Sequence, residues 1–415
     1  MCGITGIVTF DDHGKKELEK IHSSVKTLAN RGPDASGVFI GENIALGHTR
    51  LSIIDTSDNA AQPFTDPTGR FTIIFNGEFY NHKKHRTILE ASGVEFRSSS
   101  DTEVLLNLYI RDGVRFLDKI NGFFALAIYD KDEQTIFIAR DRMGIKPLLY
   151  YFDGNKFIFA SEMKAIFSFD VPKDIDTTSL FTYLELNYIP APYSIIKNIR
   201  KMTPGHYTHL DLRTKPEEIE EKEYYKIPGN SEDISLVNEN SYQDAQQQLY
   251  LLIEKAVKRR LVADVPLGTF LSGGIDSSII TSLACRHTEN LQSFSIGYKD
   301  EPYFDETRYA QMVAKKCGSN HTVFSLTNKD LYENLHNVLD YFDEPFADSS
   351  AIPVYILSQL TKKSVTVALS GDGADEMFSG YNKHQAELMA RQPGIAGRAT
   401  KLLYPLLQKL PSSRN

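Results

Sequence analysis

A cysteine stands at position 2, directly after the initiator methionine. Removal of Met1 would leave Cys2 with a thiol and its own free α-amine, and an α-amine with a pKa of about 7.7–8.0 suits a general base at neutral pH. The resulting thiolate could attack the carbon of an amide and release ammonia. We therefore expect the mature chain to begin at Cys2, although a cysteine near the start of a chain is by itself weak evidence of catalysis.

Glycine, serine and aspartate gather in residues 271–278, Leu-Ser-Gly-Gly-Ile-Asp-Ser-Ser, between a predicted strand and a predicted helix. The glycines let the backbone approach a phosphate, and the free N–H groups at a helix start attract negative charge. The hydroxyls would add donors, and Asp276 is placed to hold Mg²⁺. A glycine-rich turn with a serine or aspartate cap gives the same pattern, and the lysine of the usual phosphate-binding loop is absent.

A second segment of this kind, residues 369–376, reads Leu-Ser-Gly-Asp-Gly-Ala-Asp-Glu and also follows a predicted strand. Acidic residues and glycines at a strand end are poor packing material, because charged side chains are rarely buried without a partner. This composition favours a ligand-binding loop over a structural turn.

Short apolar runs rich in β-branched and aromatic residues predict strands through the first half of the chain, separated by turn sequences such as residues 66–69, Asp-Pro-Thr-Gly. Two helices are predicted in the same half, at residues 15–30 and 102–113. Antiparallel sheets sandwiched by helices are the expected architecture. The predicted strands are residues 4–10, 44–51, 71–75, 123–129, 135–140 and 156–161.

Residues 214–240 are rich in Glu, Lys, Asn and Ser without a hydrophobic period, which predicts a domain boundary. After a helical apolar period over residues 249–262, strands and helices alternate, which predicts a doubly wound, mostly parallel sheet with ligands at the carboxyl ends of its strands. The predicted strands are residues 265–271, 293–298, 322–326 and 364–369, and the predicted helices are residues 275–286, 307–317, 329–341 and 351–360.

The composition excludes several classes of protein. A chain of 415 residues, 41% hydrophobic and 24% charged, is typical of a soluble globular protein with two or more domains. A net charge of −8 without a block of Lys or Arg argues against nucleic acid as a partner. The longest apolar run, residues 123–129, is too short to span a membrane, and no secretory signal is evident. Three cysteines without metal-ligand or disulfide spacing are typical of a reducing cytoplasm.

Polar motifs are spread in a fixed order over the first half of the chain. They are residues 2–4 (Cys-Gly-Ile), 31–34 (Arg-Gly-Pro-Asp), 47–53 (Gly-His-Thr-Arg-Leu-Ser-Ile), 75–81 (Phe-Asn-Gly-Glu-Phe-Tyr-Asn), 100–103 (Ser-Asp-Thr-Glu) and 140–148 (Arg-Asp-Arg-Met-Gly-Ile-Lys-Pro-Leu). Together they resemble the class II glutamine amidotransferase domain, and the resemblance covers essentially all of residues 2–210. It implies an N-terminal nucleophile hydrolase fold, a four-layer αββα sandwich.

The resemblance implies a role for each polar residue, with the N-terminal thiol as the nucleophile. Arg50 would pair bidentately with the α-carboxylate of glutamine. Asp101, with Glu78 nearby, would receive the α-ammonium group. Asn76 and the backbone N–H of Gly77 would form an oxyanion hole, an effect worth about 10²–10³ in rate per donor. Taken singly, Arg50 or Asp101 would more commonly belong to a surface ion pair.

Residues 271–278 resemble the SGGxDS pyrophosphate loop of the ATP pyrophosphatases, and residues 369–376 are similar to the acidic loop of asparagine synthetases. The resemblance implies that Asp276 and Asp375 bind Mg²⁺ and pyrophosphate, and that Asp372, where several relatives carry glutamate, assists formation of the acyl-adenylate. The other implied nucleotide contacts are Leu271, Ser272, Gly273, Gly274, Ser277, Ser278, Ile296, Ser370 and Gly371.

A glutaminase domain followed by a pyrophosphate-loop domain resembles the asparagine synthetase family. The expected organisation is a glutaminase domain at residues 2–212, a linker at residues 213–240 and an ATP-binding domain at residues 241–415. Residues 343–353, Asp-Glu-Pro-Phe-Ala-Asp-Ser-Ser-Ala-Ile-Pro, add to the resemblance and would line the acceptor pocket. Family members continue with a helical segment that supplies a lysine, so we expect the synthetase half to be C-terminally incomplete here.

The implied reaction activates aspartate with ATP as β-aspartyl-AMP and amidates it with ammonia from glutamine, releasing asparagine, AMP and pyrophosphate. The implied cofactors are ATP and Mg²⁺, and the implied small-molecule partners are glutamine and aspartate. A homodimer is one oligomeric state that stays open. Three alternatives stay open at this point. They are an amidotransferase acting on another carboxylate, a glutaminase whose second half only binds nucleotide, and a non-catalytic scaffold.

Overall fold

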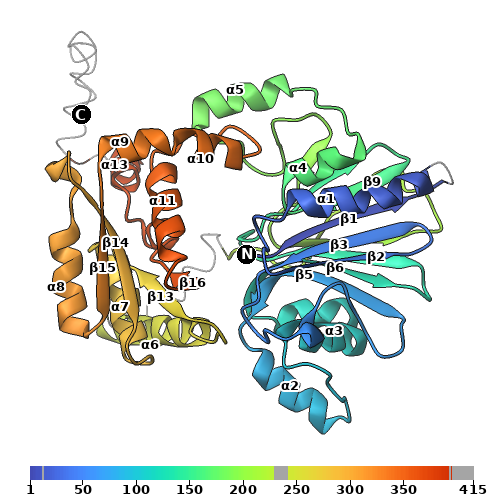
Figure 1. The fold of residues 1–415 in the computed structure, drawn as a ribbon, viewed down its shortest axis with the longest axis horizontal. Coiled ribbons are helices and arrows are strands. Elements are labelled where there is room, and N and C mark those ends of the chain that lie inside the picture. The colour runs from blue at the N-terminus through green and yellow to red at the C-terminus, as the bar shows by residue number, and fades with distance from the viewer. Residues whose placement is uncertain (12–13, 229–241, 392–393, 395–415) are drawn as a thin grey trace. The chain divides into compact units, whose positions relative to one another are not determined.

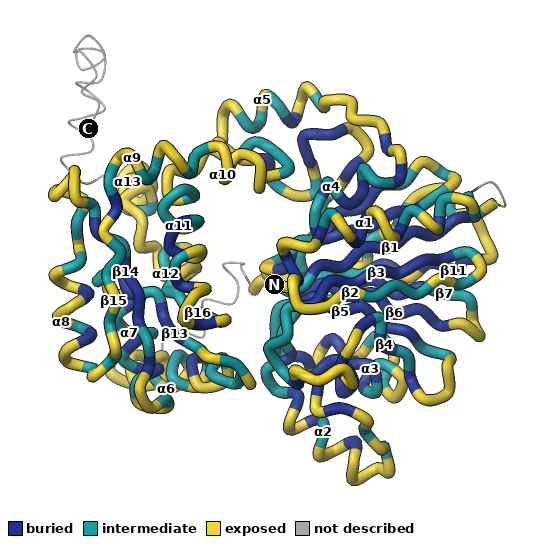
Figure 2. The backbone as a smooth tube through the Cα atoms, viewed as in Figure 1, coloured by how far each residue is buried: buried dark blue, intermediate teal, exposed yellow. Residues whose placement is uncertain are grey.

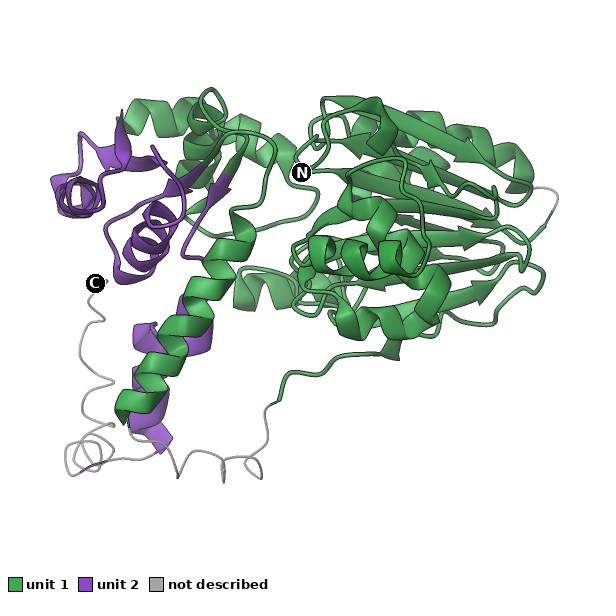
Figure 3. Ribbon diagram, turned by 90° about the horizontal axis from the view of Figure 1, so that it is seen from below, with its two compact units in different colours: residues 1–267, 326–367 green, residues 268–325, 368–415 purple. Residues whose placement is uncertain are grey.

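The computed structural model describes residues 1–11, 14–228, 242–391 and 394. Much of the predicted linker, residues 229–240, and the Lys- and Leu-rich stretch after residue 395 lie outside the described residues. The chain divides into two compact units (Figure 3). Unit 1 comprises residues 1–267 and 326–367, and unit 2 comprises residues 268–325 and 368–415.

Two six-stranded antiparallel sheets form the centre of unit 1. Their strand orders are β10-β8-β9-β1-β3-β2 and β12-β11-β7-β6-β5-β4. The strands of the first sheet are β1 (Gly3–Thr9), β2 (Ala35–Ile40), β3 (Ile44–Arg50), β8 (Leu149–Phe152), β9 (Lys156–Ala160) and β10 (Ile199–Lys201). The strands of the second are β4 (Phe64–Thr65), β5 (Phe71–Phe79), β6 (Gly122–Asp130), β7 (Thr135–Arg140), β11 (His206–Asp211) and β12 (Lys222–Glu223).

Helices cover the outer faces of both sheets, so unit 1 contains an αββα sandwich (Figure 1). The first sheet packs against α1 (Ile21–Thr27) and α4 (Met163–Ile166), and the second packs against α3 (Asp101–Asp112). The other elements in the described part of unit 1 are η1 (Gly14–Lys20), η2 (Asp58–Ala60), α2 (His82–Ala91), η3 (Gly113–Lys119), η4 (Phe167–Phe169), α5 (Thr177–Leu186), α6 (Tyr242–Arg260), α9 (Asn328–Glu333), α10 (Leu335–Tyr341) and α11 (Ala351–Thr361). The sequence-based expectation of helix-covered antiparallel sheets is confirmed.

Alternation of side chains along each strand builds the three apolar layers of this sandwich. In β1, Ile4 and Val8 join the layer between the sheets, whereas Ile7 packs in the cluster that contains Ile21 of α1. In β6, Ala127 faces the layer between the sheets and Leu126 faces α3. Because successive side chains point to opposite faces, a strand that is buried on both sides reads as a continuous apolar run. The strands accordingly form the buried interior in Figure 2.

Some predicted boundaries differ from the observed ones. Strand β5 continues four residues past the predicted end at Phe75, because Phe79 still pairs with Gly122 of β6. Asparagine, glycine and glutamate have low strand propensity, so pairing with β6 overrides the local preference. The helix predicted over residues 15–30 begins with the 3₁₀ helix η1 and becomes α-helical only at Ile21.

A four-stranded sheet of order β15-β14-β13-β16 organises unit 2, and its strands β13 and β14 pair in parallel. Its strands are β13 (Leu267–Phe270), β14 (Gln292–Tyr298), β15 (Asn320–Leu326) and β16 (Val367–Leu369). Among its described residues, the helices of unit 2 are α7 (Ile275–Cys285), η6 (Pro302–Phe304), α8 (Thr307–Cys317), α12 (Ala374–Phe378) and α13 (Asn382–Arg391). The chain moves outward from β13 to β15 and returns to β16 on the other side of β13. The predicted parallel α/β architecture is confirmed, with a topological switch point between β13 and β16.

Candidate active sites

The first candidate site lies at one end of the layer between the two sheets of unit 1. In β3, His48 and Arg50 continue the face that carries Ile44 and Leu46, because every second residue points the same way. In β5, Asn76 and Glu78 likewise continue the face that carries Ile74. One pocket brings five of the predicted residues together: its lining includes Cys2, Arg50, Gly77, Glu78 and Asp101.

The thiol of Cys2 rests against the backbone of Leu51. Its Sγ lies 3.6 Å from the carbonyl oxygen of Leu51, and the N–H of Leu51 donates to Sγ at 3.5 Å. Burial raises the pKa of the Cys2 thiol, and hydrogen bonding to the Leu51 backbone opposes that rise. A thiol held largely protonated needs a base beside it, which is the function that its own α-amine would serve once Met1 is removed.

Arg31 fixes the backbone of the nucleophile. Its Nε donates to the carbonyl oxygen of Cys2 at 2.9 Å, and its Nη1 donates to Glu162 at 2.9 Å. Arg31 is buried, so this ion pair is shielded from water. The arginine belongs to the Arg-Gly-Pro-Asp motif, but the sequence offered no signal that it reaches Cys2.

Arg50 is buried, with 6% of its surface exposed. Arginine side chains more commonly lie at the surface. Its guanidinium group donates to the carbonyl oxygens of Ser57 at 2.8 Å, Ile54 at 3.5 Å and Asp55. In the described part of the chain, the hydrogen-bond partners of this guanidinium group are carbonyl oxygens and include no carboxylate. A buried guanidinium without a counter-charge is suited to a substrate carboxylate.

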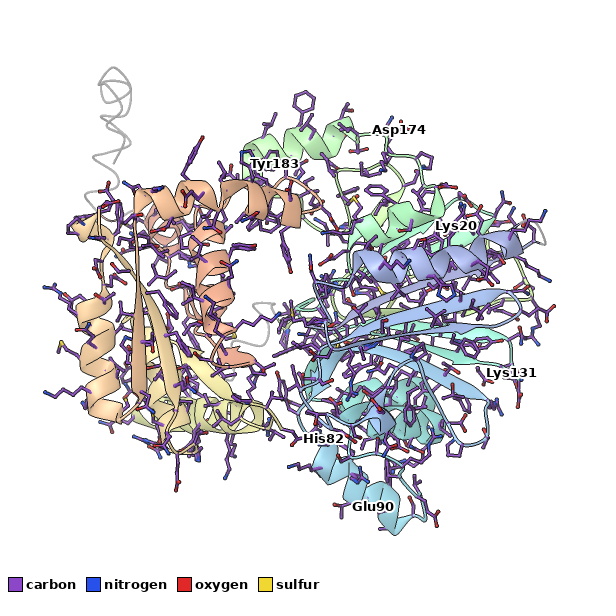
Figure 4. The ribbon with its side chains drawn as sticks, viewed as in Figure 1. Lys20, His82, Glu90, Lys131, Asp174 and Tyr183 are labelled. Carbon is purple, nitrogen blue, oxygen red and sulfur yellow. The ribbon has the colours of Figure 1, made fainter. Side chains whose placement is uncertain are left out.

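Two carboxyl groups, Glu78 and Asp101, face the same pocket. Burial and the proximity of Asp101 raise the pKa of Glu78. Burial also raises the pKa of Asp101, although the N–H of Phe79 donates to its Oδ2 at 2.9 Å and His82 lies nearby. Figure 4 labels His82 at the start of α2, where its Nδ1 lies 2.9 Å from the carbonyl oxygen of Phe79. Two neighbouring carboxyl groups, of which Asp101 is buried and Glu78 half-buried, are suited to an ammonium group, because a cation relieves their mutual repulsion.

Asn76 and Gly77, which the resemblance assigns to an oxyanion hole, are adjacent on β5, and Gly77 lines the pocket. Asn76 is fully buried, and neither its Nδ2 nor its Oδ1 has a hydrogen-bond partner in the described part of the chain. A buried amide of this kind costs free energy unless a ligand satisfies it. At Gly77 a Cβ atom would lie 2.4 Å from the carbonyl oxygen of Phe123, so only glycine fits where β5 meets β6.

Two residues of this site received no role from the sequence. His48 is fully buried, its Nε2 lies 3.2 Å from the carbonyl oxygen of Phe75, and burial lowers its pKa to about 3. Lys146 is also buried, and burial lowers the pKa of its amino group, whereas Glu78 opposes that change. The alternation that places Arg50 between the sheets also places His48 there, so strand parity could have identified it.

Substitution of Arg50 or Asp101 is expected to weaken glutamine binding more than turnover. Arg50→Ala and Asp101→Asn should raise the KM for glutamine about tenfold or more, because hydrogen bonds to charged groups contribute roughly 1.5–3 kcal/mol. The kcat should fall less, since these side chains would bind atoms remote from the reacting amide. Steady-state glutaminase kinetics measure both constants, with the exposed Arg115→Ala as the matched control. A loss confined to kcat would instead place these residues in the chemical step.

Glutamine should bind more tightly as pH rises through the raised pKa of the Glu78 and Asp101 pair. The ammonium group of glutamine requires ionised carboxylates, so binding releases a proton wherever one of them is still protonated. Calorimetry in a Cys2→Ala background measures binding without turnover, and buffers of different ionisation enthalpy report the proton release. Glu78→Gln in that background should flatten the pH dependence. An affinity that falls as pH rises over this range would contradict the assignment.

The second candidate site lies in unit 2, where two loops follow adjacent strands. After β13, residues 271–274 lead into α7, and the Oγ atoms of Ser272 and Ser277 lie 2.9 Å apart. The N–H of Gly274 donates to Ser272 Oγ at 3.2 Å, and Ser278 Oγ donates to the Gly274 carbonyl oxygen at 2.6 Å. The predicted strand–loop–helix arrangement is therefore present, with the loop at the start of an 11-residue helix.

The second loop packs closely on the first. It follows β16, and within it Ser370 Oγ donates to Asp372 Oδ2 at 2.8 Å. At Gly371 a Cβ atom would lie 2.8 Å from the backbone nitrogen of Ser277 and 2.9 Å from the Cβ of Asp276. The two loops can approach this closely only because residue 371 has no side chain, so the structure brings together loops about a hundred residues apart.

The remaining predicted residues lie on helices or strands next to the two loops. Asp276 lies in the first turn of α7, Asp375 lies in the first turn of α12, and both are partly exposed. Ile296 lies on β14, the other neighbour of β13. Among the described residues, no three His, Cys, Asp or Glu side chains are grouped to hold a metal by themselves. The residues nevertheless fit Mg²⁺, which one or two carboxylates together with substrate phosphates commonly bind.

The two helix-covered antiparallel sheets of unit 1, and the pocket that brings Cys2 together with Arg50, Glu78 and Asp101, are typical of a glutamine amidotransferase of the N-terminal nucleophile hydrolase class. Family models support both parts of the chain: a glutamine amidotransferase domain matches residues 1–225, and asparagine synthase matches residues 248–414. The chain belongs to the asparagine synthetase family. A Methanocaldococcus jannaschii protein with the provisional name asparagine synthetase (glutamine-hydrolyzing) 2 is 36% identical over 441 residues, covering 100% of this chain and 82% of the relative.

Other relatives are longer than this chain. Asparagine synthetase (glutamine-hydrolyzing) 1 of Bacillus subtilis (strain 168) is 36% identical over 94% of this chain, which spans 60% of that protein. Amidase chry2 of Gibberella zeae is 28% identical over 94% of this chain and 61% of its own length. Among solved structures, glutamine phosphoribosylpyrophosphate amidotransferase from B. subtilis is 15% identical over 79% of this chain and 81% of its own, with a TM-score of 0.41. In the described part of the chain, no helix is long and apolar enough to cross a membrane.

Proposed function

We propose that this protein catalyses glutamine-dependent asparagine synthesis. Glutamine would be hydrolysed to glutamate and ammonia in unit 1, and aspartate would be activated with ATP as β-aspartyl-AMP and then amidated. The observation that carries the glutaminase half is the pocket that joins Cys2, Arg50 and Asp101 in a chain of this family. The support for the nucleotide half is the close packing of the loops that follow β13 and β16.

The residues of the pocket would hold glutamine by its α-carbon substituents. The guanidinium group of Arg50 would bind the α-carboxylate, and Glu78 and Asp101 would bind the α-ammonium group. Both ends of the substrate are then fixed by charge, and its side-chain amide is presented to the thiol. The pocket is lined by buried and half-buried residues, and its limited contact with water would strengthen each of these interactions.

Catalysis would follow from the groups around Cys2. Its α-amine would take the thiol proton, and the thiolate would attack the amide carbon to form a tetrahedral adduct. The side-chain Nδ2 of Asn76 and the N–H of Gly77 would stabilise the negative oxygen of this adduct. The amine would return the proton as ammonia leaves, and water would then hydrolyse the thioester to glutamate.

The loops of unit 2 would hold ATP through their backbone N–H groups and hydroxyls. Mg²⁺, held by Asp276 and Asp375, would neutralise phosphate charge and favour departure of pyrophosphate. We propose the domain limits of residues 2–212 and 241–415, with residues 213–240 between them, and a cytoplasmic location, because the three cysteines are free.

Mass spectrometry of the products tests this proposal directly. The protein is incubated with glutamine, ATP, Mg²⁺ and a panel of carboxylates that includes aspartate. Asparagine and AMP should appear only when aspartate, glutamine and ATP are all present. Glutamate formation without any amidated product would reduce the proposal to a glutaminase with a nucleotide-binding half.

A second candidate is an amidotransferase for another carboxylate. Two fungal relatives, at 28% and 29% identity, carry the name amidase, so the family includes members with other names than asparagine synthetase. The same panel distinguishes the candidates, because an amidated product from a carboxylate other than aspartate would favour the second.

A further inference from the structure

In the described part of the chain, β4 covers only the start of one edge of β5. It pairs with β5 at Thr72 and Ile73, whereas β6 pairs along the opposite edge as far as Phe79. Backbone N–H groups of every second residue in a strand point to the same edge. Those of Phe75, Gly77 and Phe79 therefore share one edge, which we call the open edge of β5. Buried N–H groups at an edge without a neighbouring strand need other partners.

Two side chains contact the open edge on either side of Gly77. The Oε1 of Gln62 accepts from the N–H of Phe75 at 2.7 Å, and the Oδ2 of Asp101 accepts from the N–H of Phe79 at 2.9 Å. Gly77 lies midway between these two residues of β5 and lines the same pocket. Its N–H, the proposed oxyanion donor, therefore has a position that is fixed by hydrogen bonds two residues before it and two residues after it.

Gln62 is buried and also reaches α3. Its Nε2 donates to the Oγ1 of Thr102 at 3.2 Å. A backbone N–H can only donate, so the amide oxygen of Gln62 must face Phe75 and its amide nitrogen must face Thr102. Thr102 is buried as well and directly follows Asp101. One side chain thus joins the strand that carries the proposed oxyanion hole to the helical turn that carries a proposed ammonium-binding carboxylate.

The backbone of Gln62 is held on two sides. A Cβ atom at Gly37 of β2 would lie 2.3 Å from the carbonyl oxygen of Gln62, so β2 packs directly on this backbone. Phe64, two residues after Gln62, pairs with Ile73 of β5. Because the backbone at Gln62 is fixed, the length of its side chain sets the spacing between β5 and the first turn of α3.

The carbonyl oxygen of Phe75 has a partner from the other sheet. It lies 3.2 Å from the Nε2 of His48, a buried residue of β3. A carbonyl oxygen can only accept, so Nε2 is the ring nitrogen that carries the proton. The side chains of Gln62 and His48 therefore satisfy both polar backbone groups of Phe75, which directly precedes Asn76 of the proposed oxyanion hole.

We propose that Gln62 is a positioning residue of glutamine hydrolysis, which holds β5 so that the N–H of Gly77 points at the oxygen of the substrate amide. This inference rests on the proposed function. Negative charge develops on that oxygen in the transition state, so a misdirected donor reduces turnover more than it reduces substrate binding. Without the amide of Gln62, the buried N–H of Phe75 would lose its acceptor and β5 could shift.

Steady-state glutaminase kinetics of the full chain test this role. Gln62→Met keeps the length of the side chain but removes both polar atoms, so kcat should fall about tenfold while KM stays within about threefold of the wild type. Gln62→Glu keeps an oxygen that can accept from the N–H of Phe75 and should recover most of the lost kcat. The matched control is Gln247→Met, at an exposed position of α6 in the same compact unit.

Thr102→Val tests the contact with α3. It removes the hydroxyl oxygen that accepts from Gln62 and keeps the shape of the side chain, so kcat should fall about threefold. The double variant with Gln62→Met should be about as slow as Gln62→Met alone, because both substitutions remove the same hydrogen bond. Losses that multiply in the double variant would overturn the contact with α3 as part of the positioning role.

Hydrogen exchange across residues 74–79 provides a readout that needs no enzymatic activity. These amides should exchange faster in Gln62→Met than in the wild type and in Gln247→Met. A kcat of Gln62→Met within about twofold of the wild type would overturn the positioning role, and unchanged exchange would overturn the ordering of β5. Should Gln62→Met fail to fold, Thr102→Val decides by the same two measurements. Absence of glutamine hydrolysis in the wild type would reject the proposed function, and exchange would still decide whether Gln62 orders β5.

Discussion

Cys2→Ala should lose glutamine hydrolysis almost completely while it still binds glutamine. The substitution removes the only thiol among the residues that line the pocket, and loss of a nucleophile typically costs at least about 10³-fold in kcat. Arg50, Glu78 and Asp101 are unchanged, so glutamine affinity measured by calorimetry should stay close to that of the wild type. Glutamate release is the measurement, with Cys285→Ala of α7 as the matched cysteine control.

The same variant separates the two halves of the proposed reaction. If the chain tested contains a complete synthetase half, added ammonium should support product formation in Cys2→Ala about as well as in the wild type. Intact-mass measurement should also show that active protein lacks Met1, because the amine of Cys2 must be free to act as the base. Equal loss of glutamine-dependent and ammonium-dependent synthesis, or retention of Met1 in active protein, would contradict this mechanism.

Local patterns predicted the secondary structure around the two glycine-rich loops well, because each loop consists of consecutive residues. The helix predicted over residues 307–317 is observed with the same limits, and the loop at residues 271–274 lies between a strand and a helix as expected. In contrast, the helix predicted over residues 329–341 is two helices that meet at Asn334. The side chain of Asn334 donates to the carbonyl oxygen of Asp330 at 2.9 Å, and such bonds compete with the helical backbone.

The pocket that contains Cys2 could be predicted only in part. Because side chains alternate along a strand, Arg50 lies on the same face as His48. Glu78 lies on the same face as Asn76 for the same reason. The sequence therefore contained the information that these polar residues share faces of two strands. These two faces meet because of the way the two sheets pack, and no local sequence pattern specifies that packing. The contacts of Arg31 with Cys2, and of Asp264 with Asp55, join residues 29 and 209 positions apart and follow from the fold alone.

Asp276→Asn and Asp375→Asn should each abolish most aspartate-dependent exchange of ³²P-pyrophosphate into ATP. β13 and β16 are neighbours, so the loops after them flank one switch point, where ligands of α/β sheets bind. The close approach of Gly371 to Asp276 shows that the loops meet there. We therefore expect both carboxylates to serve one Mg²⁺–pyrophosphate group, although they lie about a hundred residues apart.

The expected loss follows from charge and not from shape. Asparagine keeps the size of aspartate but leaves the phosphates less neutralised, and hydrogen bonds to charged groups contribute roughly 1.5–3 kcal/mol each, which corresponds to about a tenfold to hundredfold decrease in exchange. Glutamine hydrolysis should be unaffected in both variants, because Cys2 and the residues that line its pocket all lie in unit 1. Asp340→Asn, an exposed position of α10, is the matched control for exchange and hydrolysis alike. Near-normal exchange in both variants would remove these two residues from the metal site, and with them the argument that ATP binds between β13 and β16.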